Sequence, residues 1–172
     1  MQEPRFFGFG SLVNTRTHSY PDPQNSKIDG WARVWRKTVL RDIAFLSVEP
    51  SPASQLWGLS ARVPDGNWAD LDLRETGYKR LQITANTAIY IVDETILDPK
   101  PRGKILLSYL DVVIQGYLDR FGPEGPAHFF ETTQGWDHEI IDDRSKPIYP
   151  RAQTIDPTLQ NSVDAFVLAA QM

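Results

Sequence analysis

The sequence predicts an α+β fold with a mixed, mostly antiparallel sheet that is curled into a partly closed barrel and flanked by helices. Several segments alternate apolar and polar residues with the period of two that is typical of strands. Two longer segments have the 3.6-residue period of amphipathic helices, and the strands do not alternate regularly with helices as they do in a parallel βαβ sheet. At 172 residues, we expect one domain over 1–172.

Composition argues against several classes of function. The chain has 18 Lys and Arg against 22 Asp and Glu, a net charge of -4, so we expect neither nucleic acid nor an anionic membrane as a partner. The N-terminus lacks a signal-peptide pattern and no apolar run approaches ~20 residues, which predicts a cytoplasmic protein. The chain has no cysteine, which excludes disulfides, thiolate metal sites and cysteine nucleophiles.

The first predicted strand, residues 5–9, runs directly into a turn of small residues. Gly8 and Gly10 have no side chain, so a ligand or another backbone segment can approach them closely, and either can adopt a positive φ. The backbone N–H groups of such a turn, together with the Ser11 hydroxyl, are suited to bind an anion such as a carboxylate or phosphate. The alternative is a plain tight turn.

Five further segments are predicted strands: residues 27–36, 44–48, 56–63, 81–84 and 87–92. Pro50 and Pro52 are expected to separate the second of these from the third. Arg33 lies between Trp31 and Trp35 on one face of the first. This placement indicates either a structural cation–π stack or a contact with a ligand.

Helices are predicted over residues 68–75 and 104–121, and after Asp156. Asn67 is the expected N-cap of the first, and Asp156 with Pro157 marks the start of the last. Residues 125–133 could be a short helix or a loop. The apolar face of the last helix could dock on the domain or on a partner subunit, which leaves a homodimer open.

Glu75 lies on the same stripe of its predicted helix as Trp68 and Leu71, at positions i, i+3 and i+7. A carboxylate that faces the core is expected either to pair with a nearby basic residue or to serve in chemistry with a pKa shifted by burial. The basic residues near it in the sequence are Arg74, Lys79 and Arg80.

Other constellations are incomplete. His138 and Glu139, followed by Asp142 and Asp143, lack the second histidine of a helical zinc motif, so we expect a solvated acidic segment that pairs with Arg144. Ser11 lacks the G-x-S-x-G elbow of a hydrolase nucleophile. The Gly-x-Gly turn lacks the third glycine and the lysine of nucleotide sites.

Two stretches in combination resemble the γ-glutamylcyclotransferase-like superfamily, specifically its ChaC-type, AIG2-like branch. They are FGFGSL at residues 7–12, similar to the family's F-G-Y-G-S-L turn, and LDLRETGY at residues 71–78, similar to its R-E-x-x-G-Y run. GWARVW at residues 30–35 and WGL at residues 57–59 also look like the family. Phe9 replaces the usual tyrosine, the glutamate run is one residue shorter than a longer variant, and residues 135–151 do not align with well-known members.

The resemblance implies a γ-glutamyl cyclotransferase that needs no cofactor and no metal. In that reaction, the α-amine of a small γ-glutamyl substrate attacks its own γ-carbonyl and releases 5-oxoproline together with an amine or amino acid. The resemblance implies that Glu75 is the catalytic acid and base. The implied substrate-binding residues are Phe9, Gly10, Ser11, Leu12, Tyr78, Tyr149, Arg151 and Arg33. The alternatives are a non-catalytic protein that binds a small carboxylate or γ-glutamyl metabolite, and a scaffold for protein contacts.

Overall fold

The computed structural model describes residues 2–100 and 102–172, which form eight strands and four α-helices. The strands are β1 (Arg5–Gly8), β2 (Gln24–Thr38), β3 (Arg41–Arg62), β4 (Tyr78–Gln82), β5 (Thr87–Val92), β6 (Lys104–Leu106), β7 (Thr133–Gln134) and β8 (Glu139–Ile141). The α-helices are α1 (Ala69–Arg74), α2 (Leu107–Phe121), α3 (Glu124–Thr132) and α4 (Pro157–Ala170). Short 3₁₀ turns are η1 (Ser11–Val13), η2 (Pro64–Gly66) and η3 (Glu94–Ile96).

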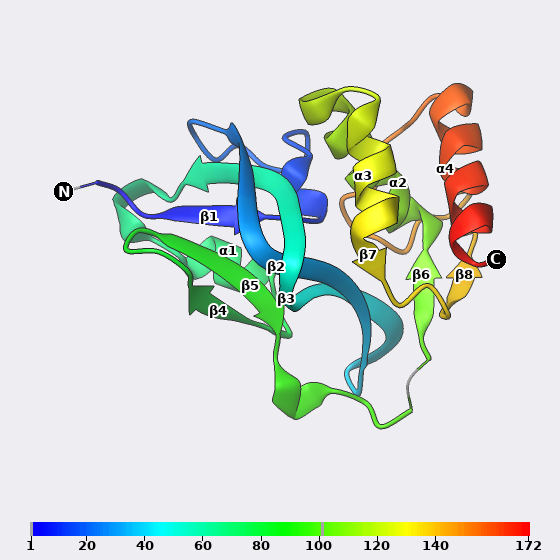
Figure 1. Cartoon of the computed structure of the whole chain (residues 1–172), viewed down its shortest axis with the longest axis horizontal. Coiled ribbons are helices and arrows are strands. Elements are labelled where there is room, and N and C mark those ends of the chain that lie inside the picture. Colours follow the sequence, from blue (N-terminus) through cyan, green and yellow to red (C-terminus); the bar gives the residue numbers. More distant parts are fainter. Residues whose placement is uncertain (1, 101) are drawn as a thin grey trace.

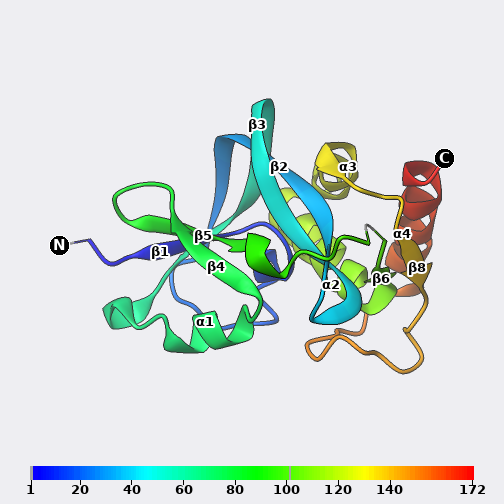
Figure 2. The ribbon, with the colours of Figure 1, turned by 90° about the horizontal axis from the view of Figure 1, so that it is seen from below.

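The strands form a mixed sheet in the order β4-β5-β1-β3-β2-β7, and β6 pairs with both β3 and β8. The long β2–β3 ladder and the β1–β3 and β4–β5 ladders are antiparallel, whereas β1 and β5 are parallel neighbours. The predicted α+β class is therefore confirmed. In the part of the chain that the structure describes, the order begins with β4 and ends with β7, so the sheet does not close on itself, which is consistent with the predicted, only partly closed arrangement. Helices α2, α3 and α4 gather at one end of the molecule, beside the strongly curved β2–β3 ribbon (Figures 1 and 2).

The structure differs from the sequence prediction at β3. One continuous strand replaces the two strands predicted at residues 44–48 and 56–63, on either side of the prolines. Trp31 of β2 pairs with Pro50, but Asp29 pairs with Gln55, so residues 51–54 bulge out of the ladder opposite Gly30. Gly30 has a φ of +86°, which glycine adopts without strain. Pro52 lies in this bulge, where no ladder N–H is required, so the strand continues beyond it.

The helices lie close to their predicted ranges. Residues 104–106, expected to open the long helix, instead form β6, because an apolar run of Ile and Leu suits a buried strand as well as a helix. Asp156 caps α4 as predicted, accepting the N–H of Leu159 at 2.9 Å. The N-cap position of α1 is Trp68, and Asn67 accepts the N–H of Ala69 from one residue further out. Residues 124–132 are helical.

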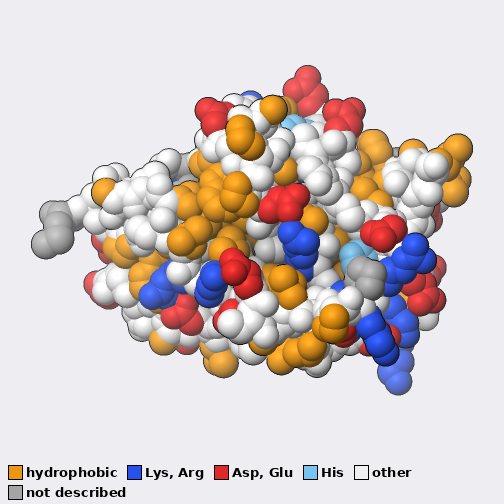
Figure 3. Space-filling model, turned by 60° about the horizontal axis from the view of Figure 1, so that its bottom comes forward, with side chains coloured by type: hydrophobic (Ala, Val, Ile, Leu, Met, Phe, Trp, Pro, Cys, Tyr) orange, Lys and Arg blue, Asp and Glu red, His pale blue; other side chains and the backbone are white. Residues whose placement is uncertain are grey.

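The core lies between the sheet and α2, whose apolar stripe is buried as predicted. α4 buries Leu159, Val163 and Val167 in this core, and Phe166 stacks on Phe130 of α3 with ring centroids 4.9 Å apart. Charges of both signs are interspersed with hydrophobic side chains on the face seen in Figure 3. Among the described residues, we find no helix with the length and hydropathy needed to cross a bilayer.

Candidate active site

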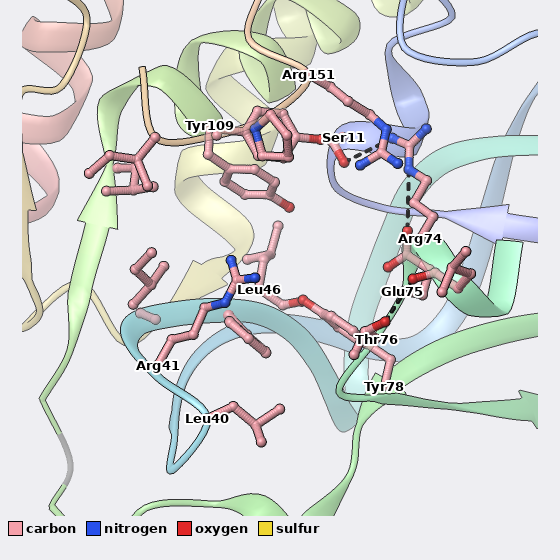
Figure 4. Close-up of a pocket in the computed structure, with 18 of the residues that line it drawn as sticks. Ser11, Leu40, Arg41, Leu46, Arg74, Glu75, Thr76, Tyr78, Tyr109 and Arg151 are labelled. Atoms are coloured by element: carbon pink, nitrogen blue, oxygen red, sulfur yellow. Dashed lines mark hydrogen bonds and ion pairs between the residues drawn. The ribbon is translucent and has the colours of Figure 1, made fainter. Parts of the chain in front are cut away.

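A cavity of about 470 Å³ opens between the β2–β3 hairpin, the end of α1 and residues 148–151 (Figure 4). A much smaller recess of about 30 Å³ adjoins it. It is bounded by residues 7–12, Leu46, Glu75, Tyr78, Tyr90 and Tyr109. The residues that line both spaces are Ser11, Leu46, Glu75, Tyr78 and Tyr109. The recess has room for roughly two or three water-sized atoms, which suits a small polar group, and the cavity suits a larger one.

The glycine turn after β1 forms one wall of the recess. A Cβ on Gly8 would lie 2.5 Å from the Cβ of Leu12, and a Cβ on Gly10 would lie 2.6 Å from the hydroxyl of Tyr109. Both glycines are therefore needed for close approach. Neither adopts the positive φ that the sequence allowed; Gly10 has φ of −122°. In the described part of the chain, the N–H groups of Gly10 and Leu12 donate to no backbone carbonyl outside the regular ladders and helices.

A buried cation holds the peptide group that precedes this turn. Arg33 is fully buried, and its Nε donates to the carbonyl of Phe9 at 3.1 Å, while the hydroxyl of Tyr117 donates to the same carbonyl at 2.8 Å. Because the peptide bond is trans and planar, the N–H of Gly10 points away from Arg33. The guanidinium lies over the rings of Tyr117 and Phe129, not between tryptophans as the strand pattern suggested.

Glu75 immediately follows the last residue of α1 and lines both the recess and the cavity. Its side chain is only 15% exposed, and its Oε1 lies 3.5 Å from the Nε of Arg74. Burial raises the pKa of Glu75 above its ordinary value of 4.5, and the charges of Arg74 and Arg151 partly oppose this rise. The carboxyl therefore favours its protonated form more than an exposed glutamate does.

Arg74 links Glu75 to the glycine turn. Its guanidinium donates to the Ser11 hydroxyl at 3.2 Å, and to the carbonyl and hydroxyl of Thr17, each at 2.9 Å. Figure 4 shows Arg74 between Ser11 and Glu75, with Arg151 pointing towards the guanidinium of Arg74. Two segments that are about sixty residues apart in the sequence are thus joined across the recess.

Tyr78, Tyr109 and Tyr149 complete the walls of the cavity. The hydroxyl of Tyr78 donates to the carbonyl of Leu46 at 2.8 Å, and its ring stacks on Phe45. Burial raises the pKa of Tyr78 and of Tyr109 well above the usual value near 10, so both hydroxyls stay neutral at physiological pH. Tyr109 contacts the ring of Tyr149 edge-on at 5.0 Å. The buried hydroxyl of Tyr149 has no hydrogen-bond partner among the described residues.

The loop that carries Tyr149 and Arg151 is fastened to α2 by the acidic segment before it. Asp143 accepts the N–H and hydroxyl of Ser108 and the N–H of Ile148. Arg144 forms a two-pronged pair with Asp111 of α2, at 2.7 and 2.8 Å. The predicted pairing within a solvated acidic segment is therefore wrong, because Arg144 reaches Asp111 and Asp164 instead. His138 accepts the N–H of Gly103 at 2.8 Å.

The structure brings most of the candidate residues together. Phe9, Gly10, Ser11, Leu12, Glu75 and Tyr78 line the recess, and Tyr149 and Arg151 line the cavity. Arg33 lines neither space, because its donors are occupied in the core. Sequence reasoning missed Tyr109 and Arg41. Tyr109 lies off the apolar stripe of its helix and Arg41 follows a hairpin turn, so neither has a pattern that marks it.

Comparisons with known proteins agree on the fold. No family model and no curated protein matches the sequence. A solved structure described as a γ-glutamyl cyclotransferase superposes with a TM-score of 0.58 at 13% identity, covering 95% of this chain and 99% of its own. YkqA from Bacillus subtilis has a TM-score of 0.57 at 16% identity over 78% of this chain, which spans 57% of that protein. An uncharacterised protein from Homo sapiens has a TM-score of 0.55 at 12% identity, covering 95% of this chain and 99% of that one.

These similarities extend over most of the chain, 78–95% of it. At 12–16% identity they establish the arrangement of the backbone and leave the chemistry to the site itself. The chain has the fold of the γ-glutamylcyclotransferase-like superfamily.

Proposed function

We propose that this protein is a γ-glutamyl cyclotransferase. In the reaction, the α-amine of a γ-glutamyl group attacks its own γ-carbonyl, and a new C–N bond closes a five-membered ring. The C–N bond to the leaving group then breaks, and the products are 5-oxoproline and a free amine or amino acid. The observation that carries the proposal is the juxtaposition of the glycine turn and the buried Glu75 on one recess.

The turn suits the grip on the substrate. The N–H groups of Gly10 and Leu12 and the Ser11 hydroxyl can bind the α-carboxylate or the developing oxyanion, and charge-assisted hydrogen bonds of this kind are the stronger ones. The guanidinium groups of Arg74 and Arg151 add positive charge beside them. Because the nucleophile belongs to the substrate itself, holding the folded conformer supplies much of the rate advantage.

Glu75 suits the proton transfers. The α-amine is mostly an ammonium ion at neutral pH and must lose a proton before it attacks, and the leaving nitrogen must gain one. A carboxyl whose pKa is raised by burial can accept the first proton and return one to the leaving group. Among the described residues that line the recess, Glu75 is the only carboxyl, and the tyrosines beside it hold their protons tightly.

The test is to incubate the protein with glutathione, γ-glutamyl dipeptides and γ-glutamylamines and to measure 5-oxoproline release. Release that depends on Glu75 supports the enzyme. Release from none of them, with tight binding of 5-oxoproline, would instead indicate a non-catalytic binding protein that uses the same recess.

A further inference from the structure

The outer cavity has features that ring closure in the recess does not require. It is far larger than the recess, and it is lined by a third arginine, Arg41, and by apolar side chains from three separate segments. If the recess binds the α-carboxylate of the γ-glutamyl head, the rest of the substrate, including the group released on ring closure, must lie in this outer space. Its walls therefore carry information about which leaving group fits.

The charges around the cavity are unbalanced. Arg41, Arg74 and Arg151 line it, against only two carboxyls, Asp70 and Glu75. Arg74 is engaged by Glu75, Ser11 and Thr17. Among the described residues, neither Arg41 nor Arg151 forms an ion pair, and Arg151 acts electrostatically on Glu75 beside the recess. One positive charge remains for the outer part of the cavity, at Arg41.

Arg41 is placed to meet a ligand rather than to stabilise the fold. Its carbonyl accepts a hydrogen bond from the ammonium of Lys37 at 3.0 Å, which anchors the backbone at the hairpin. Its guanidinium reaches from the hairpin towards the middle of the cavity (Figure 4). A carboxylate in the cavity could form the two-pronged pair that guanidinium groups favour.

Exposed apolar side chains gather at the mouth of this cavity. Leu40, Leu73 and Ile148 are 51%, 75% and 57% exposed, and all three line it although they belong to the hairpin, α1 and the last loop. Single exposed apolar residues are ordinary, but three that line one opening mark a binding surface for an apolar group. Phe45 and Ile43 extend the apolar wall inward.

We propose that the outer cavity is a leaving-group site that selects γ-glutamyl compounds whose leaving group has a free carboxylate and a bulky apolar side chain. Arg41 pairs with the carboxylate, and Leu40, Leu73 and Ile148 cover the side chain. A leaving group that is a simple amine lacks the carboxylate, so it leaves Arg41 without a partner. The proposal rests on the proposed function and deepens it.

Two substrates that differ only in that carboxylate test the role of Arg41: γ-glutamyl-phenylalanine and γ-glutamyl-phenethylamine. We expect the first to have a higher kcat/KM by up to about fivefold, the upper end of what an exposed ion pair contributes. Arg41→Gln is expected to remove this preference by slowing only the first substrate. Arg102→Gln is the matched control, since Arg102 is 73% exposed and does not line the cavity.

The apolar rim has a test of its own. Leu73→Ser is expected to lower kcat/KM for γ-glutamyl-phenylalanine severalfold while leaving γ-glutamyl-alanine nearly unchanged, because alanine is too short to reach the rim. Leu168→Ser, which replaces a similarly exposed leucine on α4, is the control and should change neither.

The outcomes separate the two proposals. No 5-oxoproline from any of these compounds would overturn the proposed function. Release at equal rates from the acid and the amine, or an Arg41→Gln effect that is the same for both, would overturn the leaving-group site while the cyclotransferase activity stands. A Leu73→Ser effect of equal size on the alanine and phenylalanine compounds would overturn the apolar part.

Discussion

Replacing Glu75 with glutamine separates its catalytic role from a structural one. The amide keeps the size and shape of the side chain but can neither accept nor return a proton. No other carboxyl among the described residues lines the recess, so no neighbour is placed to substitute for it. We expect the full contribution of a positioned acid and base, roughly 10²–10⁴-fold in kcat, to be lost. This corresponds to about 3–5 kcal/mol of transition-state stabilisation.

The fold should survive this change, and the pKa of Glu75 determines whether the variant gains or loses stability. Burial raises that pKa above 4.5, so the folded wild-type protein binds the proton more tightly than the unfolded chain does. The stability that protonation provides is present at low pH and is lost as the pH rises from the unfolded value through the raised folded value. Glu75→Gln lacks this pH-dependent loss, so its Tm should equal or exceed that of the wild type at pH 8, with a smaller difference at pH 4.

The assay is 5-oxoproline release together with thermal unfolding at both pH values. Glu94→Gln is the matched control, because Glu94 is 78% exposed, lies outside the recess and pairs with the exposed Lys79 at 3.6 Å. Nearly normal turnover in Glu75→Gln would remove this residue from the mechanism. A variant that loses stability at pH 8 would show that the pair with Arg74 stabilises the fold, contrary to the reasoning above.

Three further substitutions probe the framework of the site. Gly10→Ala places a methyl group 2.6 Å from the hydroxyl of Tyr109, which must displace the turn or the tyrosine. We expect a loss of kcat/KM of up to about 100-fold. The added change Tyr109→Phe removes the clashing hydroxyl and should recover part of that loss. Tyr117→Phe removes a hydroxyl whose single proton is shared between the carbonyls of Phe9 and Trp57 and whose oxygen accepts from Arg33. The change should cost about 1–3 kcal/mol in chemical denaturation, and an unchanged midpoint would contradict the role given to that hydroxyl. Arg144→Met leaves the buried carboxyl of Asp111 without its partner and should cost about 3 kcal/mol, lowering the Tm by roughly 6–12 °C. Adding Asp111→Asn should restore most of that loss, and a double variant as unstable as the single one would refute the explanation.

The sequence identified the parts of the site whose chemistry is local. The small residues of the glycine turn and the apolar spacing before Glu75 are patterns over a few positions. The structure places the turn and Glu75 on the recess, although Glu75 follows the last residue of α1 and does not lie on its face. The prolines of β3 misled because their effect depends on pairing: Pro52 is harmless only because a bulge opposite Gly30 leaves it outside the ladder.

Other features could not be found without the fold. The sequence left Arg33 open as a structural cation–π stack or a ligand contact. The structure shows a core residue, because α2 and α3 bring Tyr117 and Thr132 to its guanidinium, which holds the carbonyl of Phe9. Tyr109 reaches the recess only through the docking of α2 beside the turn. Contacts between residues a hundred positions apart leave no periodic signal in a single sequence.

The most direct measurement is a crystal structure of the protein soaked with 5-oxoproline, the proposed product. The account predicts that its carboxylate or ring carbonyl accepts hydrogen bonds from the N–H groups of the turn at Gly10 to Leu12, with the carboxyl of Glu75 within hydrogen-bond reach of the ring. Density elsewhere on the molecule, or a 5-oxoproline bound at the turn with its ring away from Glu75, would contradict it.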